Sequence, residues 1–179
     1  MGCEVDRWPP VYDFDSLQAE IKQLINRGLE ENFYSENPNL EELFQGDIIE
    51  LDIIFPYIDN SGNVSGIDAN KWLILGNTCD ITRDDLAYTN ILPLDELRED
   101  VPYEIINNLK KFQSYKKIFF PDISKKTLGY VAEFTKICSI EKSYLLQEFK
   151  KVSELEYHSW VLFHSCIIRY FARDDGRND

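Results

Sequence analysis

The chain has 179 residues, of which 44% are hydrophobic and 13% aromatic, and this composition excludes a disordered chain and favours one folded domain. The formal net charge is −13, and residues 1–60 carry most of it, with 14 acidic and 3 basic side chains. Such a balance argues against broad nucleic-acid binding, which needs cations facing phosphates, although six lysines between residues 110 and 126 leave room for a local basic groove.

Residues 1–38 are expected to form an acidic helical extension ahead of the main unit, residues 39–179. Within the extension, Leu17, Ile21 and Leu24 recur at the spacing of one helical face. Two interpretations are open for this amphipathic helix: its apolar face packs on the main unit, or the helix docks on a basic partner.

Five strands are predicted from apolar runs bounded by turn residues. The first covers residues 48–55 and is expected to end at Pro56, and an exposed connection with strong turn chemistry follows at residues 59–66. The other four cover residues 71–76, 88–94, 117–121 and 128–140. Because the strands do not alternate with helices, we expect an α+β fold with a mainly β core, arranged as a small antiparallel barrel.

Three helices are expected after the second strand, at residues 103–112, from residue 143 to 149, and at residues 152–173. The last of these carries apolar residues over so much of its circumference that it must be largely buried. The predicted barrel is therefore flanked by helices at both ends of the chain.

Four cysteines stand at positions 3, 79, 138 and 166, with no C-x-x-C pair and no zinc-like spacing. We therefore expect no metal and no cofactor. No secretory signal or membrane span is visible, so the expected compartment is a reducing cytoplasm with free thiols and no membrane partner.

Residues 71–83 hold the densest group of reactive side chains next to a buried element. Residues 72–75 predict a strand buried on both faces, and Thr78, Cys79 and Asp80 follow where that strand leaves the core. Three interpretations are open. Cys79 is a small buried residue while Asp80 caps the turn, or Cys79 is a nucleophile, or the turn is a polar binding site.

A nucleophilic Cys79 would need His158 or His164 as its base, and these are the two histidines of the chain. A metal site drawn from Cys79, Asp80, the histidines and the cysteines would require tertiary convergence. Ion pairing is also expected, with Asp47, Asp80 and Arg173 close together. The predicted binding residues are Asp47, Asn77, Cys79, Asp80 and Arg173.

The order of Gly46-Asp47, the aliphatic run 72–75 and the proline-containing segment 90–94 resembles the MazF/PemK toxin family over residues 44–95. That resemblance implies a small SH3-like barrel and a metal-independent endoribonuclease of toxin–antitoxin systems. Members of that family often dimerise, so a homodimer is one expectation.

This chain departs from the toxin pattern just before the second strand. The family has Arg-Pro there and uses the arginine in cleavage, whereas this chain has Asn70-Lys71 followed by Trp72. Lysine keeps the positive charge but lacks the bidentate guanidinium. If the chain is a ribonuclease, the catalytic residues available are Lys71, Thr78 and Arg83.

The whole chain is similar to a broader, uncharacterised group of bacterial small-barrel proteins. The shared features are Gly46-Asp47, the polar-x-Cys-Asp step at residues 77–80 and a closing aromatic-x-Arg pattern that ends at Arg173. Some proteins of this group accompany mobile-element or phage-defence genes, which implies a protein partner.

Two functions are therefore carried forward. The first is a non-catalytic bacterial interaction module, and the alternative is a MazF/PemK-like endoribonuclease or a derived nucleic-acid-binding barrel, with RNA as a possible partner. A toxin should present Lys71 and Arg83 on one open groove. An interaction module should have residues 77–80 hydrogen-bonded internally and an exposed apolar patch elsewhere.

Overall fold

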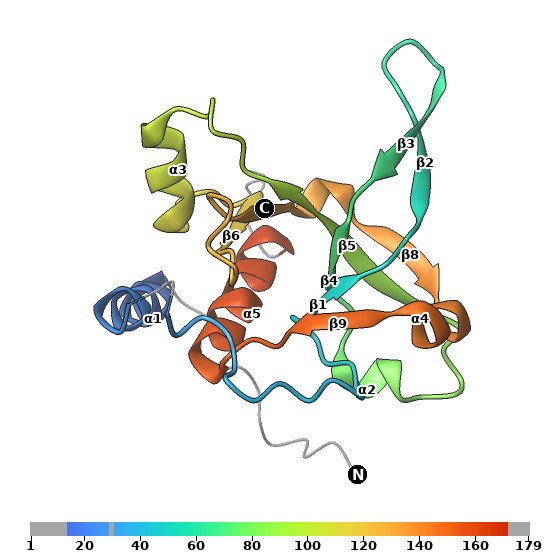
Figure 1. Cartoon of the computed structure of the whole chain (residues 1–179), viewed down its shortest axis with the longest axis horizontal. Helices are drawn as coiled ribbons and strands as arrows, with labels where there is room; N and C mark the ends of the chain where they lie inside the picture. Colours follow the sequence, from blue (N-terminus) through green and yellow to red (C-terminus); the bar gives the residue numbers. More distant parts are fainter. Residues whose placement is uncertain (1–13, 29–30, 172–179) are drawn as a thin grey trace, which may run out of the picture.

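The structure is a computed structural model that describes residues 14–28 and 31–171, and its body is a curled antiparallel sheet (Figure 1). This architecture confirms the α+β class and the antiparallel sheet. The strands of this sheet are β1 (Ile48–Glu50), β4 (Lys71–Ile74), β5 (Tyr88–Glu96), β6 (Lys117–Phe120), β7 (Tyr130–Glu133), β8 (Cys138–Glu141) and β9 (Lys150–Ser153).

The strands lie in the order β6-β7-β5-β4-β1-β9, and β8 also pairs with β5. The long strand β5 is therefore shared. Residues Tyr88 to Ile91 pair with β8, the middle of β5 pairs with β4, and Leu94 to Glu96 pair with β7. A strand with different partners along its length bends the sheet, and this bending produces the curl.

The strand β4 is buried on both faces, as its four consecutive large apolar residues predict. Leu73 and Leu75 belong to one hydrophobic cluster, and Trp72 and Ile74 belong to a second cluster across the sheet. This alternation places the β4 main chain between two cores and fixes the position of the turn that follows it.

Helices cover the sheet. They are α1 (Phe14–Asn26), α2 (Thr78–Ile81), α3 (Tyr103–Lys110), α4 (Lys142–Glu148) and α5 (Tyr157–Phe171), with a 3-10 turn at Phe134–Lys136. The helix α5 lies against the first cluster and α1 contacts α5. Because Ile21 and Leu24 of α1 are buried, the apolar face of the first helix packs on the body. Docking of a basic partner on this helix, and the domain division at residue 38, stay predictions.

The expected first strand is two strands. After β1 the chain leaves the sheet and forms β2 (Ile54–Ile58), which pairs with β3 (Val64–Asp68) in a projecting hairpin (Figure 1). The prediction that Pro56 ends the strand is wrong, because a two-stranded ribbon has open edges where the missing N–H of a proline is harmless. The exposed connection expected at residues 59–66 is the hairpin turn together with the start of β3.

Two later expectations also change. The strand expected at 128–140 is interrupted by the 3-10 turn, so that β7 and β8 pair with different parts of β5. The last helix begins at Tyr157 rather than at residue 152, because Lys150–Ser153 form the edge strand β9 beside β1.

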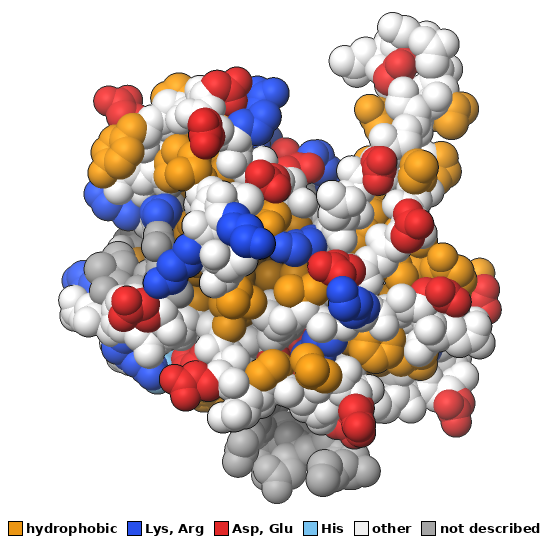
Figure 2. All heavy atoms as spheres, in the orientation of Figure 1, with side chains coloured by type: hydrophobic (Ala, Val, Ile, Leu, Met, Phe, Trp, Pro, Cys, Tyr) orange, Lys and Arg blue, Asp and Glu red, His pale blue; other side chains and the backbone are white. Residues whose placement is uncertain are grey.

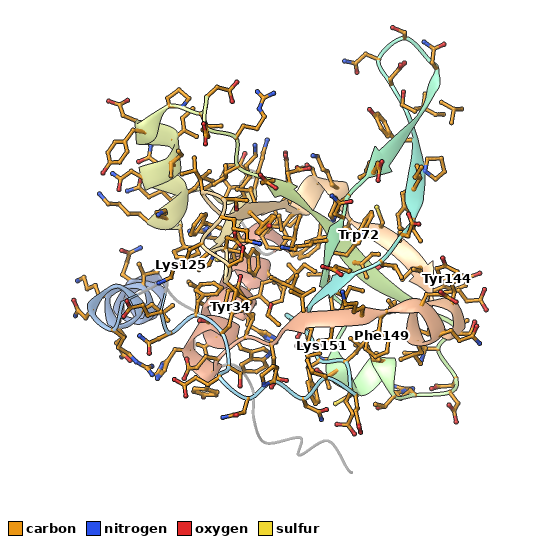
Figure 3. All side chains as sticks on the ribbon, viewed as in Figure 1. Tyr34, Trp72, Lys125, Tyr144, Phe149 and Lys151 are labelled. Carbon is orange, nitrogen blue, oxygen red and sulfur yellow. The ribbon has the colours of Figure 1, made fainter. Side chains whose placement is uncertain are left out.

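A buried ion pair ties β9 to the segment that precedes β1. The Nζ of Lys151 lies 2.7 Å from Oδ2 of Asp47, and the two side chains are 0% and 1% exposed. The ammonium also donates to the Glu42 carbonyl at 3.0 Å and to the Glu154 carboxylate at 2.9 Å. Lys151 projects from β9 into the lower half of the body (Figure 3). Desolvation makes such a pair costly to break, because either charge is left buried alone.

Replacing Lys151 with Met is expected to lower the free energy of unfolding by about 3–5 kcal/mol, since the Asp47 carboxylate then remains buried without its cation. The adjacent Lys150→Met is the matched control. Lys150 pairs with Glu50 at the surface, where an ion pair contributes about 0–1 kcal/mol. Urea denaturation at pH 7 measures both variants, and equal losses would contradict the role given to Lys151.

The pH dependence of stability offers a second prediction. Burial raises the pKa of Asp47 from 3.8 to about 6, although Lys151 and the Phe44 N–H both lower it. The folded chain therefore keeps a proton that the unfolded chain releases. The stabilisation is complete below pH about 4 and is lost as the pH rises through about 6, a difference of about 3 kcal/mol.

In Asp47→Asn this decline is absent. The unfolding free energies of wild type and variant are measured at pH about 4 and about 7. Relative to the variant, the wild type should lose about 3 kcal/mol of stability between the lower and the higher pH. A difference that stays constant between these two pH values would show that Asp47 titrates normally.

Candidate functional site

The turn after β4 is held by its own polar side chains. Asn77 is the N-cap of α2, and its side-chain oxygen accepts the N–H of Cys79 at 2.9 Å. Thr78 Oγ1 accepts the N–H of Gln45 at 2.9 Å. Asn77 rather than Asp80 is therefore the capping residue. Both predicted polar groups therefore accept hydrogen bonds from backbone N–H groups.

Lys142 closes the other end of this turn. Its Nζ donates to the carbonyl oxygens of Asp80 at 2.9 Å and Ile81 at 3.4 Å, and also to that of Arg83. The lysine is 7% exposed. A helix C-terminus leaves carbonyl groups without partners, and here a buried ammonium satisfies them.

Asp80 and Arg83 lie at the surface beside each other. The guanidinium of Arg83 is 3.8 Å from Asp80 and makes two contacts with Asp85, at 3.0 and 2.7 Å. Both carboxylates raise the pKa of Arg83, and the hydrogen-bonded Asp85 has the larger effect. Arg83 is thus already bound to carboxylates.

Cys79 is disulfide-bonded, whereas Cys138 and Cys166 are buried free thiols, so the expectation of free thiols fails at Cys79. The ring Nε2 of His164 contacts Oε1 of Gln45, and burial lowers the pKa of this histidine to about 4. A cysteine held in a disulfide and a histidine held by an amide do not form a nucleophile–base pair.

The expected cluster of Asp47, Asp80 and Arg173 stays a prediction, because one of its members is not described. Asp47 is 1% exposed and bound to Lys151, which makes it a structural residue. Arg173 lies outside the described residues. Of the predicted binding residues, the structure brings Asn77, Cys79 and Asp80 together on α2 and its cap.

The three candidate ribonuclease residues lie apart. Lys71 begins β4, while Thr78 and Arg83 follow its other end. Lys71 donates to the Tyr130 hydroxyl at 2.7 Å and lies 4.2 Å from the centre of that ring. The groove expected of a toxin, shared by Lys71 and Arg83, is therefore not supported by this arrangement.

A cavity of about 280 Å³ lies beside the turn, lined in part by Asn77, Asp80, Thr89 and Phe171. Thr89 is 6% exposed and its hydroxyl has no hydrogen-bond partner. Gly76 stands so close to this hydroxyl that a Cβ there would overlap it. The sequence gives no signal for Thr89, because it lies on β5, a different strand from the turn, and threonine is a common residue in strands.

A larger groove of about 870 Å³ lies at the base of the hairpin. Its charged lining is acidic except for one lysine, and comprises Glu50, Asp52, Asp68, Asp95, Glu96 and Lys71. Two of these carboxylates have lysine partners, since Glu50 pairs with Lys150 and Asp95 with Lys136. The groove therefore carries negative charge next to an element that projects from the body.

The hairpin β2–β3 exposes one apolar face. Ile54, Ile58 and Val64 are 66%, 74% and 76% exposed, and Pro56 is exposed between the two isoleucines. Alternation along β2 and the pairing of Ile58 with Val64 put these four residues on the same side, which we call the arm face. Figure 2 shows hydrophobic side chains along the projecting hairpin, with acidic side chains near its base.

Within residues 14–28 and 31–171, no three His, Cys, Asp or Glu side chains are grouped so as to hold a metal ion. No helix in the same ranges combines the length and apolarity that crossing a bilayer requires.

No known family model matches the chain. Phosphoribosylformylglycinamidine synthase subunit PurQ of Picrophilus torridus is 36% identical over 80 residues, which are 45% of this chain and 30% of that protein. The chain thus spans less than a third of the length of this relative, and the match does not assign it to a family.

Lys142→Met is expected to loosen the turn, because three carbonyl groups lose a buried donor, at a cost of about 1–3 kcal/mol. Amide hydrogen exchange of residues 77–86 should accelerate while exchange in β4 stays slow. Lys136→Met, which removes a surface ion pair with Asp95, is the control. Unchanged exchange in residues 77–86 would show that the turn does not depend on Lys142.

Proposed function

We propose that the protein is a non-catalytic interaction module of a bacterial system, and that the arm face is its contact surface. The observation that carries this proposal is a projecting hairpin with four apolar side chains on one exposed face. Soluble proteins rarely expose contiguous apolar patches without a partner.

The arm is anchored so that it presents this face to solvent. Its opposite face carries Phe55 and Ile67, which pack against the second hydrophobic cluster. The Phe55 ring lies 5.4 Å from that of Trp72, and Trp72 lies close to the base of the hairpin (Figure 3). A preorganised surface loses less entropy on binding than a flexible loop.

Charge indicates what kind of partner fits. The acidic groove adjoins the arm through Asp52, just before β2, and Asp68, at the end of β3. A protein with an apolar patch flanked by lysine or arginine would match both features, since complementary charge steers association and suppresses wrong partners. We therefore propose that the partner is a basic protein.

The resemblance described above supplies the context of this proposal, namely an SH3-like barrel acting in a phage-defence or mobile-element system. The curled antiparallel sheet is compatible with that finer fold. The alternative, a MazF-like endoribonuclease, rests on Lys71, which has no carboxylate within ion-pairing distance among the described residues. The separation of Lys71 from Thr78 and Arg83 makes it the weaker proposal.

The double variant Ile58→Ser/Val64→Ser is expected to weaken partner binding by about tenfold or more, because central apolar residues dominate interface energies. The partner is recovered by cross-linking in the native host, purified, and titrated by calorimetry against wild type and variant. Tyr103→Ser on α3, also highly exposed at 79%, is the matched control. Binding should also weaken as salt rises.

Three outcomes would overturn this proposal. The first is equal binding by the arm variant and the wild type. The second is that light scattering finds a dimer for the wild type and a monomer for the arm variant, because the arm face would then bind a second copy of this chain. The third is growth arrest with RNA cleavage when the chain is expressed alone, abolished in Lys71→Ala/Arg83→Ala.

A further inference from the structure

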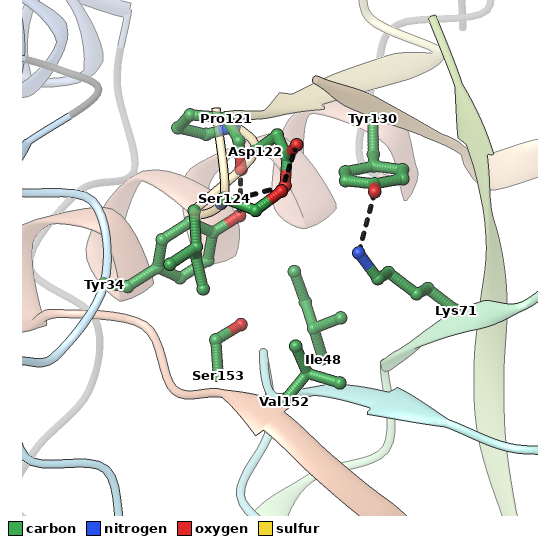
Figure 4. A pocket seen from close by; sticks show the side chains of 10 residues that line it. Tyr34, Ile48, Lys71, Pro121, Asp122, Ser124, Tyr130, Val152 and Ser153 are labelled. Carbon is green, nitrogen blue, oxygen red and sulfur yellow. Dashed lines mark hydrogen bonds between the residues drawn. The ribbon is translucent and has the colours of Figure 1, made fainter. Parts of the chain in front are cut away.

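A further cavity, of about 200 Å³, lies on the body of the protein and shares Lys71 and Tyr130 with the groove at the base of the hairpin (Figure 4). Its walls come from separate parts of the chain. They include Tyr34, Ile48 of β1, Lys71 of β4, Tyr130 of β7 and Ser153 of β9. With residues 121–124, six segments thus converge on a space that is smaller than the roughly 300–1,000 Å³ typical of drug-sized ligand sites.

Three hydrogen-bond donors face this cavity with donor capacity to spare. Ser153 is 3% exposed, and its buried hydroxyl has no hydrogen-bond partner in the part of the chain that the structure describes. Lys71 carries three N–H donors and uses one on the Tyr130 hydroxyl, which accepts that bond and keeps its own hydrogen. Figure 4 shows the Ser153 hydroxyl and the Lys71 ammonium turned into the same space from different sides.

The acceptors around the cavity are already used. Tyr34 donates to the Pro121 carbonyl at 2.8 Å. The Asp122 carboxylate accepts the backbone N–H groups of Ser124, Lys126 and Thr127, and these bonds close its own loop. The cavity therefore offers donors without free acceptors, and a ligand must supply acceptor atoms.

The lining of the cavity contains one ammonium, that of Lys71, and one carboxylate, that of Asp122, whose oxygens accept hydrogen bonds from its own loop. Lys71 is half-buried and, among the described residues, has no carboxylate within ion-pairing distance, in a chain with 32 acidic side chains. A half-buried ammonium that only a phenol contacts is a site where an anion gains a charge-assisted hydrogen bond.

The remaining wall is apolar. Ile48, Val152, Ile123 and the Tyr34 ring line the space between the donors. We propose that this cavity binds a small organic carboxylate, with its carboxylate on Lys71, Tyr130 and Ser153 and its apolar body against Ile48, Val152 and Tyr34. The Lys71 ammonium can pair with one ligand carboxylate, because the Asp122 oxygens are hydrogen-bonded within their own loop, whereas a phosphate dianion would meet too few cations, a nearby carboxylate and an apolar wall.

The test uses the full chain and benzoate, titrated by calorimetry and by ligand-observed NMR. We expect a Kd of about 1 mM or tighter, as suits a ligand of this size. Lys71→Met should weaken binding about tenfold or more, while Lys150→Met should leave it unchanged. Benzyl alcohol, which has the same ring and no charge, should bind much more weakly.

Ser153→Ala separates this site from a structural role. The Ser153 hydroxyl has no partner within residues 14–28 and 31–171, so its removal should leave the unfolding midpoint in urea unchanged. Benzoate binding should nevertheless weaken about three- to tenfold.

Four results would overturn the proposal. They are a benzoate Kd weaker than about 10 mM, benzoate binding that Lys71→Met leaves intact, benzyl alcohol binding as tightly as benzoate, or inorganic phosphate binding more tightly than benzoate.

Discussion

The structure depends on one buried charge pair, Asp47 with Lys151. The carbonyl of Asp47 accepts the N–H of Ile74 at 2.9 Å, so the residue that holds the lysine also extends the pairing with β4. Gln45, two residues earlier, donates from its side-chain amide to the Leu75 carbonyl and from its backbone N–H to the hydroxyl oxygen of Thr78. The segment before β1 therefore positions both the edge strand and the turn after β4.

The same pair makes the stability of the fold depend on the protonation state of Asp47. Desolvation disfavours the carboxylate more than the lysine stabilises it, so the pKa of Asp47 is raised even beside a cation. One carboxylate oxygen, Oδ1, also lacks a hydrogen-bond partner. The pair thus fixes the geometry of three elements at an energetic cost that hydrophobic burial offsets.

The parts of the fold that the sequence predicts well are those with strong local patterns. The run of large apolar residues in β4 and the helical periodicity of α1 both identify their elements. The strand β9 was missed because Lys150 and Lys151 look solvent-exposed, and only a carboxylate distant in sequence makes Lys151 a core residue. Pro56 was wrongly predicted to end a strand. A proline is excluded from a strand that has neighbours on both sides, but it is tolerated in a two-stranded hairpin, and the sequence does not show how many neighbours a strand has.

The candidate site shows a similar division. Asn77 was predicted as a polar residue at a strand end, and its role as a cap follows from that position. Lys71 was singled out for a comparison with toxins, yet it lines both the acidic groove at the base of the hairpin and the cavity that Tyr130 and Ser153 also line. No pattern in one sequence connects Tyr130 or Ser153 with Lys71, because their proximity arises only when the sheet curls.

The pairing of β1 with β9 also has a kinetic consequence. Glu50 and Lys150 are 100 residues apart and must meet before the sheet is complete. At about 5–20 residues per second, a ribosome needs roughly 5–20 s to make the intervening chain. During that time the hairpin β2–β3, which is local in sequence, can already form. The outer edge of β1 still lacks β9, and the carboxylate of Asp47 still lacks Lys151. The nascent chain therefore exposes an unpaired strand edge beside an apolar ribbon, and slow synthesis of the C-terminal third favours association between incomplete chains.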